Sequence, residues 1–101
     1  MEQHSDKLGN LKIFITAAGG YIACQEIERK DGKRSRIIRH PGLTQIRSDS
    51  TGYDFKPLTL VSRDMEIFEG SLMGEIDLPH AAVDFYLKYY NEREDSFSKL
   101  P

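Results

Sequence analysis

The sequence has 101 residues and a formal net charge of −2, and 39% of its residues are hydrophobic and 30% charged. This size predicts one domain, and no apolar run approaches the roughly 18 residues that a transmembrane helix needs. Residues 1–7 lack the apolar segment of a signal peptide. Cys24 is the only cysteine, so an internal disulfide is excluded, and we expect a cytoplasmic protein with a buried, inert thiol.

Three parts are expected along the chain. Residues 1–10 are polar and are expected to be flexible, residues 11–95 are expected to form the single domain, and residues 96–101 a C-terminal tail. Within the domain, short runs rich in β-branched and aromatic residues predict an antiparallel sheet of about five or six strands. The candidate strands are residues 11–17, 21–29, 33–40, 43–47, 53–61, 65–68 and 71–76.

The connections between these strands carry recognisable turn signals. Asp31-Gly32 predicts a two-residue hairpin turn, because both residues tolerate the positive φ that such turns require. Pro41-Gly42 is expected to end the return strand. Pro57 cannot donate to a ladder, so the strand that contains it is expected at a sheet edge or at a bulge.

The last part of the domain changes from a strand pattern to a helical one. No glycine occurs from Pro79 to about Asp95, and Asp77 is a candidate cap for a helix in this range. We expect this helix to pack on one face of the sheet, which gives an α+β fold. Its apolar arc is unusually wide. The alternative is therefore that its aromatic side chains form a subunit contact in a homodimer. The aromatic residues considered for that contact are Tyr86, Tyr89 and Tyr90.

Positive charge is concentrated in residues 29–47, which contain seven basic residues and one acid. The basic residues are Arg29, Lys30, Lys33, Arg34, Arg36, Arg39 and Arg47. In a hairpin about Asp31-Gly32, one face would carry three of the arginines with no local acid, an arrangement suited to phosphate or carboxylate groups. These three are Arg29, Arg34 and Arg36.

Two interpretations of the basic segment stay open. Tyr53 and Phe55 could supply stacking surfaces beside the cations, as in proteins that bind single-stranded nucleic acid. Alternatively, the arginines could solvate the end of a hairpin, or meet the acidic region 64–77 of the same chain.

Signatures of catalysis or of a cofactor are weak. Three histidines and one cysteine, far apart in the sequence, predict no zinc site, and we expect no cofactor. Asp54-Phe55-Lys56 has the acid-x-Lys spacing of some metal-dependent nucleases, which makes such an enzyme a remote alternative. The sequence therefore favours a non-enzymatic binding module whose basic hairpin engages nucleic acid or an acidic protein surface. The alternative is a protein–protein adapter or inhibitor that acts through the aromatic C-terminal helix.

Overall fold

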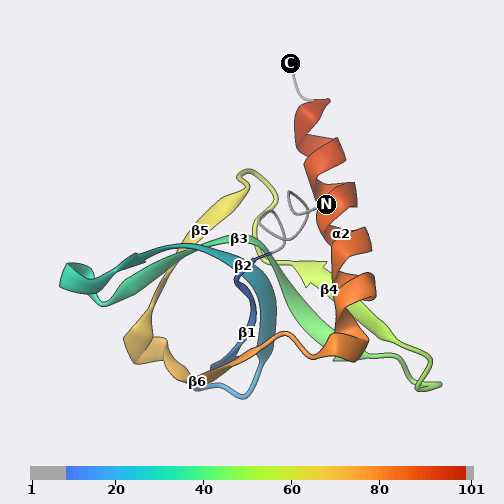
Figure 1. The fold of residues 1–101 in the computed structure, drawn as a ribbon, viewed down its shortest axis with the longest axis horizontal. Coiled ribbons are helices and arrows are strands. Elements are labelled where there is room, and N and C mark those ends of the chain that lie inside the picture. The colour runs from blue at the N-terminus through green and yellow to red at the C-terminus, as the bar shows by residue number, and fades with distance from the viewer. Residues whose placement is uncertain (1–8, 100–101) are drawn as a thin grey trace.

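A computed structural model describes residues 9–99 of the chain (Figure 1). Within these residues, six antiparallel strands form one sheet and a C-terminal helix packs on it, so the predicted α+β class is confirmed. The elements are β1 (Leu11–Thr16), β2 (Tyr21–Lys30), β3 (Ser35–Ile46), β4 (Tyr53–Pro57), β5 (Asp64–Phe68), β6 (Leu72–Asp77) and α2 (His80–Ser98), with short 3₁₀ turns η1 (Asp31–Lys33) and η2 (Glu69–Ser71). The helix of this part of the chain is too short or too polar to cross a membrane.

The order of the strands across the sheet is β4-β3-β2-β1-β6, and β5 also pairs with β3. The sheet is strongly curved, so that β1, β2, β3, β5 and β6 surround a common centre, while β4 and α2 lie to one side (Figure 1). Turn η2 joins β5 to β6 at the corner of this curved sheet. The curvature brings the acidic second half of the chain close to the first two hairpins.

Strand β3 is longer than the sequence pattern predicts. Instead of ending at Pro41-Gly42, it continues to Ile46. The strand bends at His40, whose φ is 50°. Before the bend, residues 35–39 pair with β5, and after it, residues 42–46 pair with β4. The predicted break is therefore a change of partner within one strand.

Both faces of the curved sheet are covered by apolar side chains. Between the sheet and α2, the buried residues are Ile13, Ala23, Leu78, Ala82 and Tyr86. On the inner, concave face they are Phe14, Ile22, Cys24, Ile38 and Ile67. Neighbouring residues of β1 and β2 therefore enter different cores, and the expected burial of Cys24 is confirmed.

The helix differs from its predicted limits at both ends. Pro79 is its N-terminal flanking residue, while Asp77 belongs to β6, so the expected cap is wrong. At the other end α2 runs to Ser98, so the tail expected from residue 96 begins as helix. Residues 1–8, most of the expected flexible N-terminus, lie outside the described part of the chain.

Three tyrosines of α2 attach the helix to the sheet. The hydroxyl of Tyr86 donates to the carbonyl of His40 at 2.9 Å, and that of Tyr89 donates to the carbonyl of Pro41 at 3.2 Å. The hydroxyl of Tyr90 donates to Oε1 of Gln25 at 2.7 Å. Tyr86 is completely buried. Its side chain therefore belongs to the core and is not part of a surface that a partner could contact.

Candidate functional site

The tip of the basic hairpin is wider than a two-residue turn. Residues 31–34 separate the strands, and Lys30 lies opposite Ser35 while Arg29 lies opposite Arg36. The positive φ falls on Arg34, at 53°, and its amide donates to the carbonyl of Asp31 at 3.1 Å. The predicted turn about Asp31-Gly32 is wrong, because Asp31–Lys33 forms a 3₁₀ turn and Arg34 makes the left-handed step back into β3.

Arg36 is enclosed by carboxylates on the inner face of the sheet. Its Nη1 lies 2.6 Å from Oε1 of Glu75 and 3.7 Å from Oε1 of Glu26, and its Nε lies 3.2 Å from Oε2 of Glu69. The guanidinium also lies over the ring of Phe14, 5.5 Å from its centre. Burial alone would raise the pKa of Glu75, but the hydrogen bonds from Arg36 and Lys12 outweigh it and lower that pKa. Arg36 is therefore a partner of interior acids.

Three further arginines of the basic segment have carboxylate partners. Arg29 pairs with Glu26 at 3.2 Å, and Arg39 binds both oxygens of Asp64 at 2.7 and 3.1 Å. Arg47 pairs with Asp54 at 2.9 Å. The expectation of an arginine face without a local acid is wrong for Arg29 and Arg36. The curvature of the sheet, which sequence spacing does not reveal, places carboxylates of β5, η2 and β6 beside arginines of β3. The alternative in which arginines meet the acidic region 64–77 is confirmed for Arg36 and Arg39, and also for Arg29, whose Nη2 lies 3.9 Å from Oε2 of Glu75.

Three cations remain at the tip of the hairpin: Lys30, Lys33 and Arg34. None of them forms an ion pair with a residue in the range 9–99, and Lys33 and Arg34 are exposed. The hairpin projects from the curved sheet, at the left of Figure 1. Arg47, in contrast, follows the opposite end of β3. The basic segment is thus split between two distant parts of the surface.

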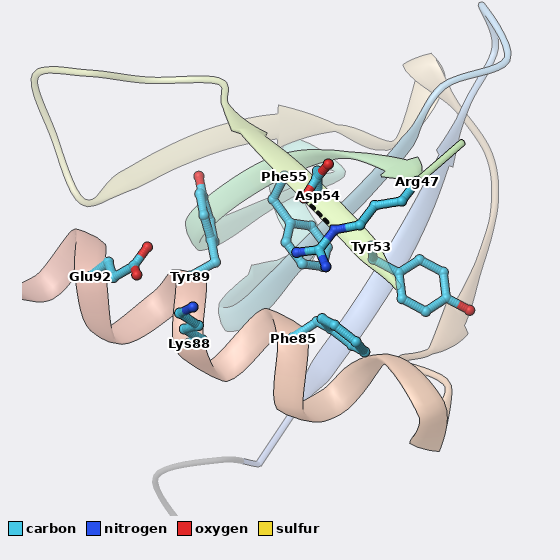
Figure 2. Close-up of a pocket in the computed structure, with 8 residues that line it drawn as sticks. All are labelled: Arg47, Tyr53, Asp54, Phe55, Phe85, Lys88, Tyr89 and Glu92. Atoms are coloured by element: carbon cyan, nitrogen blue, oxygen red, sulfur yellow. Dashed lines mark hydrogen bonds and ion pairs between the residues drawn. The ribbon is translucent and has the colours of Figure 1, made fainter. Parts of the chain in front are cut away.

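An open pocket of about 330 Å³ lies between β4 and α2 (Figure 2). Strand β4 and the residue that follows β3 supply one wall, and one flank of the helix supplies the other. The lining residues are Arg47, Tyr53, Asp54, Phe55, Phe85, Lys88, Tyr89 and Glu92. The four from α2 are spaced i, i+3, i+4 and i+7, which places them on one stripe of the helix. The pocket joins Arg47, Tyr53 and Phe55 of the basic-segment hypothesis to Tyr89 of the helix hypothesis.

The aromatic walls of this pocket are held by contacts between the two elements. The rings of Phe55 and Tyr89 lie 5.4 Å apart between centres, and those of Tyr53 and Phe85 lie 5.9 Å apart. The Arg47 guanidinium lies over the ring of Phe85, 5.4 Å from its centre. Such ring pairs and cation–ring contacts are favourable geometries, so the walls are preformed.

Gly52, which precedes β4, explains how Phe85 comes so close to the strand. A Cβ at this position would overlap the ring of Phe85, so only glycine leaves room for that ring against the backbone. The sequence analysis missed Phe85, Lys88 and Glu92 as site residues. Their i, i+3, i+7 spacing was visible in the sequence, but nothing there indicated which flank of the helix would face β4.

The rim of the pocket carries two exposed charges with no ion-pair partner among the described residues, Lys88 and Glu92. The acid of the acid-x-Lys triplet, Asp54, is engaged with Arg47. Within residues 9–99 no group of three or more His, Cys, Asp or Glu side chains could hold a metal ion. The arrangement is suited to holding a group by contact and charge.

Comparisons with protein-family models, with curated proteins and with solved structures found no match to this chain.

Proposed function

We propose that this protein is a non-enzymatic interaction module that binds a protein partner in the pocket between β4 and α2. The observation that supports the proposal is the convergence of four aromatic rings, from two elements, on one open pocket with charged groups at its rim. Aromatic side chains supply large contact areas at protein interfaces. The volume of about 330 Å³ is at the low end for sites that enclose a small molecule, and suits one or two side chains of a larger partner.

We rank binding of a protein partner in this pocket above nucleic-acid binding by the arginines. The reason is that Arg29, Arg36, Arg39 and Arg47 already have carboxylate partners, so their charges are largely compensated before any partner arrives. The pocket, by contrast, keeps aromatic surface open to solvent.

Selection of random linear peptides displayed on phage, with the purified protein as bait, tests the proposed function. Enriched peptides should bind the Phe85→Ala variant at least tenfold more weakly, because that substitution removes one wall of the pocket. Tyr21→Ala is the matched control, since Tyr21 is an exposed aromatic residue outside the pocket. Enriched peptides that bind the Phe85→Ala variant as tightly as the parent, or the absence of any enrichment, would contradict the proposal.

A second function is favoured by one specific observation, the uncompensated cations at the hairpin tip. We propose that Lys30, Lys33 and Arg34 engage an acidic partner, with nucleic acid phosphates as the first to test. Fluorescence anisotropy with labelled single-stranded DNA and RNA should show binding that is lost when all three residues are changed to Ser. Changing Lys56, Lys88 and Lys99 to Ser removes the same charge elsewhere and should leave binding intact. Equal loss in both triple variants would contradict a role of the tip.

A further inference from the structure

The outer edge of β4 has no strand beside it among residues 9–99. β4 is the last strand of the sheet order, with β3 as its one partner. Pro57 predicted that this strand lies at a sheet edge or contains a bulge, and the edge position is confirmed. An open strand edge presents backbone donors and acceptors to any extended chain that comes near it.

The register identifies the backbone groups that point outward from this edge. Gly52 and Leu58 face β3, because Arg47 donates to the carbonyl of Gly52 at 2.9 Å and Leu58 donates to the carbonyl of Pro41 at 3.1 Å. Since antiparallel pairs alternate with a period of two residues, Asp54 and Lys56 also face β3. The amides and carbonyls of Tyr53 and Phe55 therefore face outward.

The pocket is lined by side chains from both faces of this strand, since Asp54 alternates with Tyr53 and Phe55. On α2, Tyr90 reaches across to Gln25 of β2, whereas Tyr89 contacts Phe55 of β4. The stripe of the helix that carries Phe85, Lys88 and Glu92 therefore lies on the flank of α2 that faces β4. The aromatic walls and the two unpaired charges line one groove between β4 and α2 (Figure 2), and the outward-facing backbone groups of Tyr53 and Phe55 belong to the same strand.

We propose that this groove binds an extended peptide that adds to the sheet as an antiparallel strand along β4. The inference rests on the proposed function and names its binding mode. Strand addition supplies affinity through the backbone groups of Tyr53 and Phe55, and selectivity through side chains that face the helix. Antiparallel pairing is slightly more stable per residue than parallel pairing, and it continues the pattern of the sheet.

Charge complementarity specifies the sequence of the peptide. The ring pairs Tyr53–Phe85 and Phe55–Tyr89 show that β4 and α2 run in the same sense. Alternate residues of an extended peptide lie about 6.6 Å apart on one face, close to the roughly 6 Å between helix positions i and i+4 such as Lys88 and Glu92. An antiparallel peptide should therefore present, from its N-terminus, a base opposite Glu92, an acid opposite Lys88 and an aromatic residue against Phe85.

The probe is the peptide acetyl-Thr-Lys-Thr-Glu-Thr-Phe-Thr-amide. Its control exchanges the Lys and the Glu, which keeps the composition and net charge. NMR titration of the ¹⁵N-labelled protein should give binding about fivefold tighter for the probe than for the control, a size expected for two exposed ion pairs. A Lys88→Glu, Glu92→Lys double variant should reverse this preference, because it exchanges the charges of the rim.

Hydrogen exchange distinguishes strand addition from other ways of occupying the groove. The bound probe should slow amide exchange at Tyr53 and Phe55, while amides that already face β3, such as those of Asp54 and Lys56, should change little. Binding without slower exchange at Tyr53 and Phe55, equal affinity for the two peptides, or no binding of either would overturn strand addition. The phage selection with Phe85→Ala tests the interaction function separately, so its success alongside any of these results would leave the module intact and its binding mode wrong.

Discussion

Arg36 has the role of an interior counter-charge. Its side chain is 10% exposed, and three glutamates from β2, η2 and β6 surround it. Removing such a cation leaves partly buried carboxylates with no opposite charge nearby, which is unfavourable. This residue consequently links segments that are far apart in the sequence.

An Arg36→Ala variant should lose about 3 kcal/mol of unfolding free energy, because Glu26 and Glu75 would stay partly buried without their partner. Urea unfolding followed by circular dichroism measures the loss. Lys33→Ala, a change in the exposed η1 turn, should stay within about 0.5 kcal/mol of the parent. A loss as small for Arg36→Ala as for Lys33→Ala would show that the carboxylate cluster contributes little to stability.

His40 is a buried titratable group at the bend of β3. Burial lowers its pKa, and Arg93 and Arg39 lower it further, whereas Glu94, whose Oε2 lies 3.2 Å from Nε2, acts in the opposite direction. The net pKa of His40 lies below the ordinary value of about 6.5. The folded protein therefore takes up the proton at lower pH than the unfolded chain does.

Stability should fall as the pH decreases from about 6.5 toward the lowered pKa of His40, since the unfolded state binds the proton first in this range. Urea midpoints between pH 7.5 and 5.5 measure this fall. The His40→Asn variant should show a flatter profile, and Asn tolerates the φ of 50° at this position. The carboxylates with lowered pKa values, Glu75 and Glu94, lose their contribution only below about pH 4.5, outside that window. An unchanged slope in His40→Asn would assign the dependence to another group.

At the scale of elements, the contact between α2 and the sheet depends on close approach at the bend of β3. A Cβ on Gly42 would lie 2.9 Å from the Cβ of Phe55 and 3.1 Å from the ring of Tyr89. Both neighbours belong to the wall of the pocket, and the Cβ of Phe55 cannot move without its strand. Gly42 therefore sets the spacing between β3, β4 and the helix.

Gly42→Ala should reduce the unfolding free energy by about 1–3 kcal/mol, because the added methyl group overpacks this contact. Thermal unfolding provides the measurement. Gly70→Ala is the matched control, since a Cβ on Gly70 would meet nothing within 4 Å. Equal effects of the two substitutions would mean that general glycine flexibility, and not the contact with Phe55 and Tyr89, determines the result.

Local patterns predicted the elements well where the decisive contacts are local. The strands, the helix and the edge position of β4 follow from residue types and from Pro57. Pro41-Gly42 was misleading, because a bend that transfers a strand from one partner to another has the same residue signature as a turn that ends it. The hairpin tip was misleading for a related reason, since Asp31-Gly32 also fits a 3₁₀ turn.

At the scale of the whole molecule, the distribution of charge depends on how the sheet curves. The pairing of Arg36 with Glu75 joins residues 39 positions apart, and no sequence pattern specified that β6 would lie against β1, beside Arg36. The basic segment was therefore visible in the sequence, but its neutralisation was not. The candidate pocket was predictable in its residue types and not in its location, because it depends on which flank of α2 faces β4.

Any binding of single-stranded nucleic acid should depend on salt only weakly. Three free cations at the hairpin tip release at most about three counterions, which corresponds to a slope of log K against log salt near −2. Anisotropy titrations at several salt concentrations measure this slope. A slope near −5 would require most of the seven basic residues to contact phosphates, and would contradict the ion pairs of Arg29, Arg36, Arg39 and Arg47.

Pro57 limits the outward-facing amides of β4 to those of Tyr53 and Phe55. Because proline offers no amide hydrogen, a chain aligned there finds no donor beyond Phe55. Two copies of the protein that met through their β4 edges would gain few backbone hydrogen bonds, so association along this edge is disfavoured. An edge of this length suits a short peptide better than a second copy of the whole sheet.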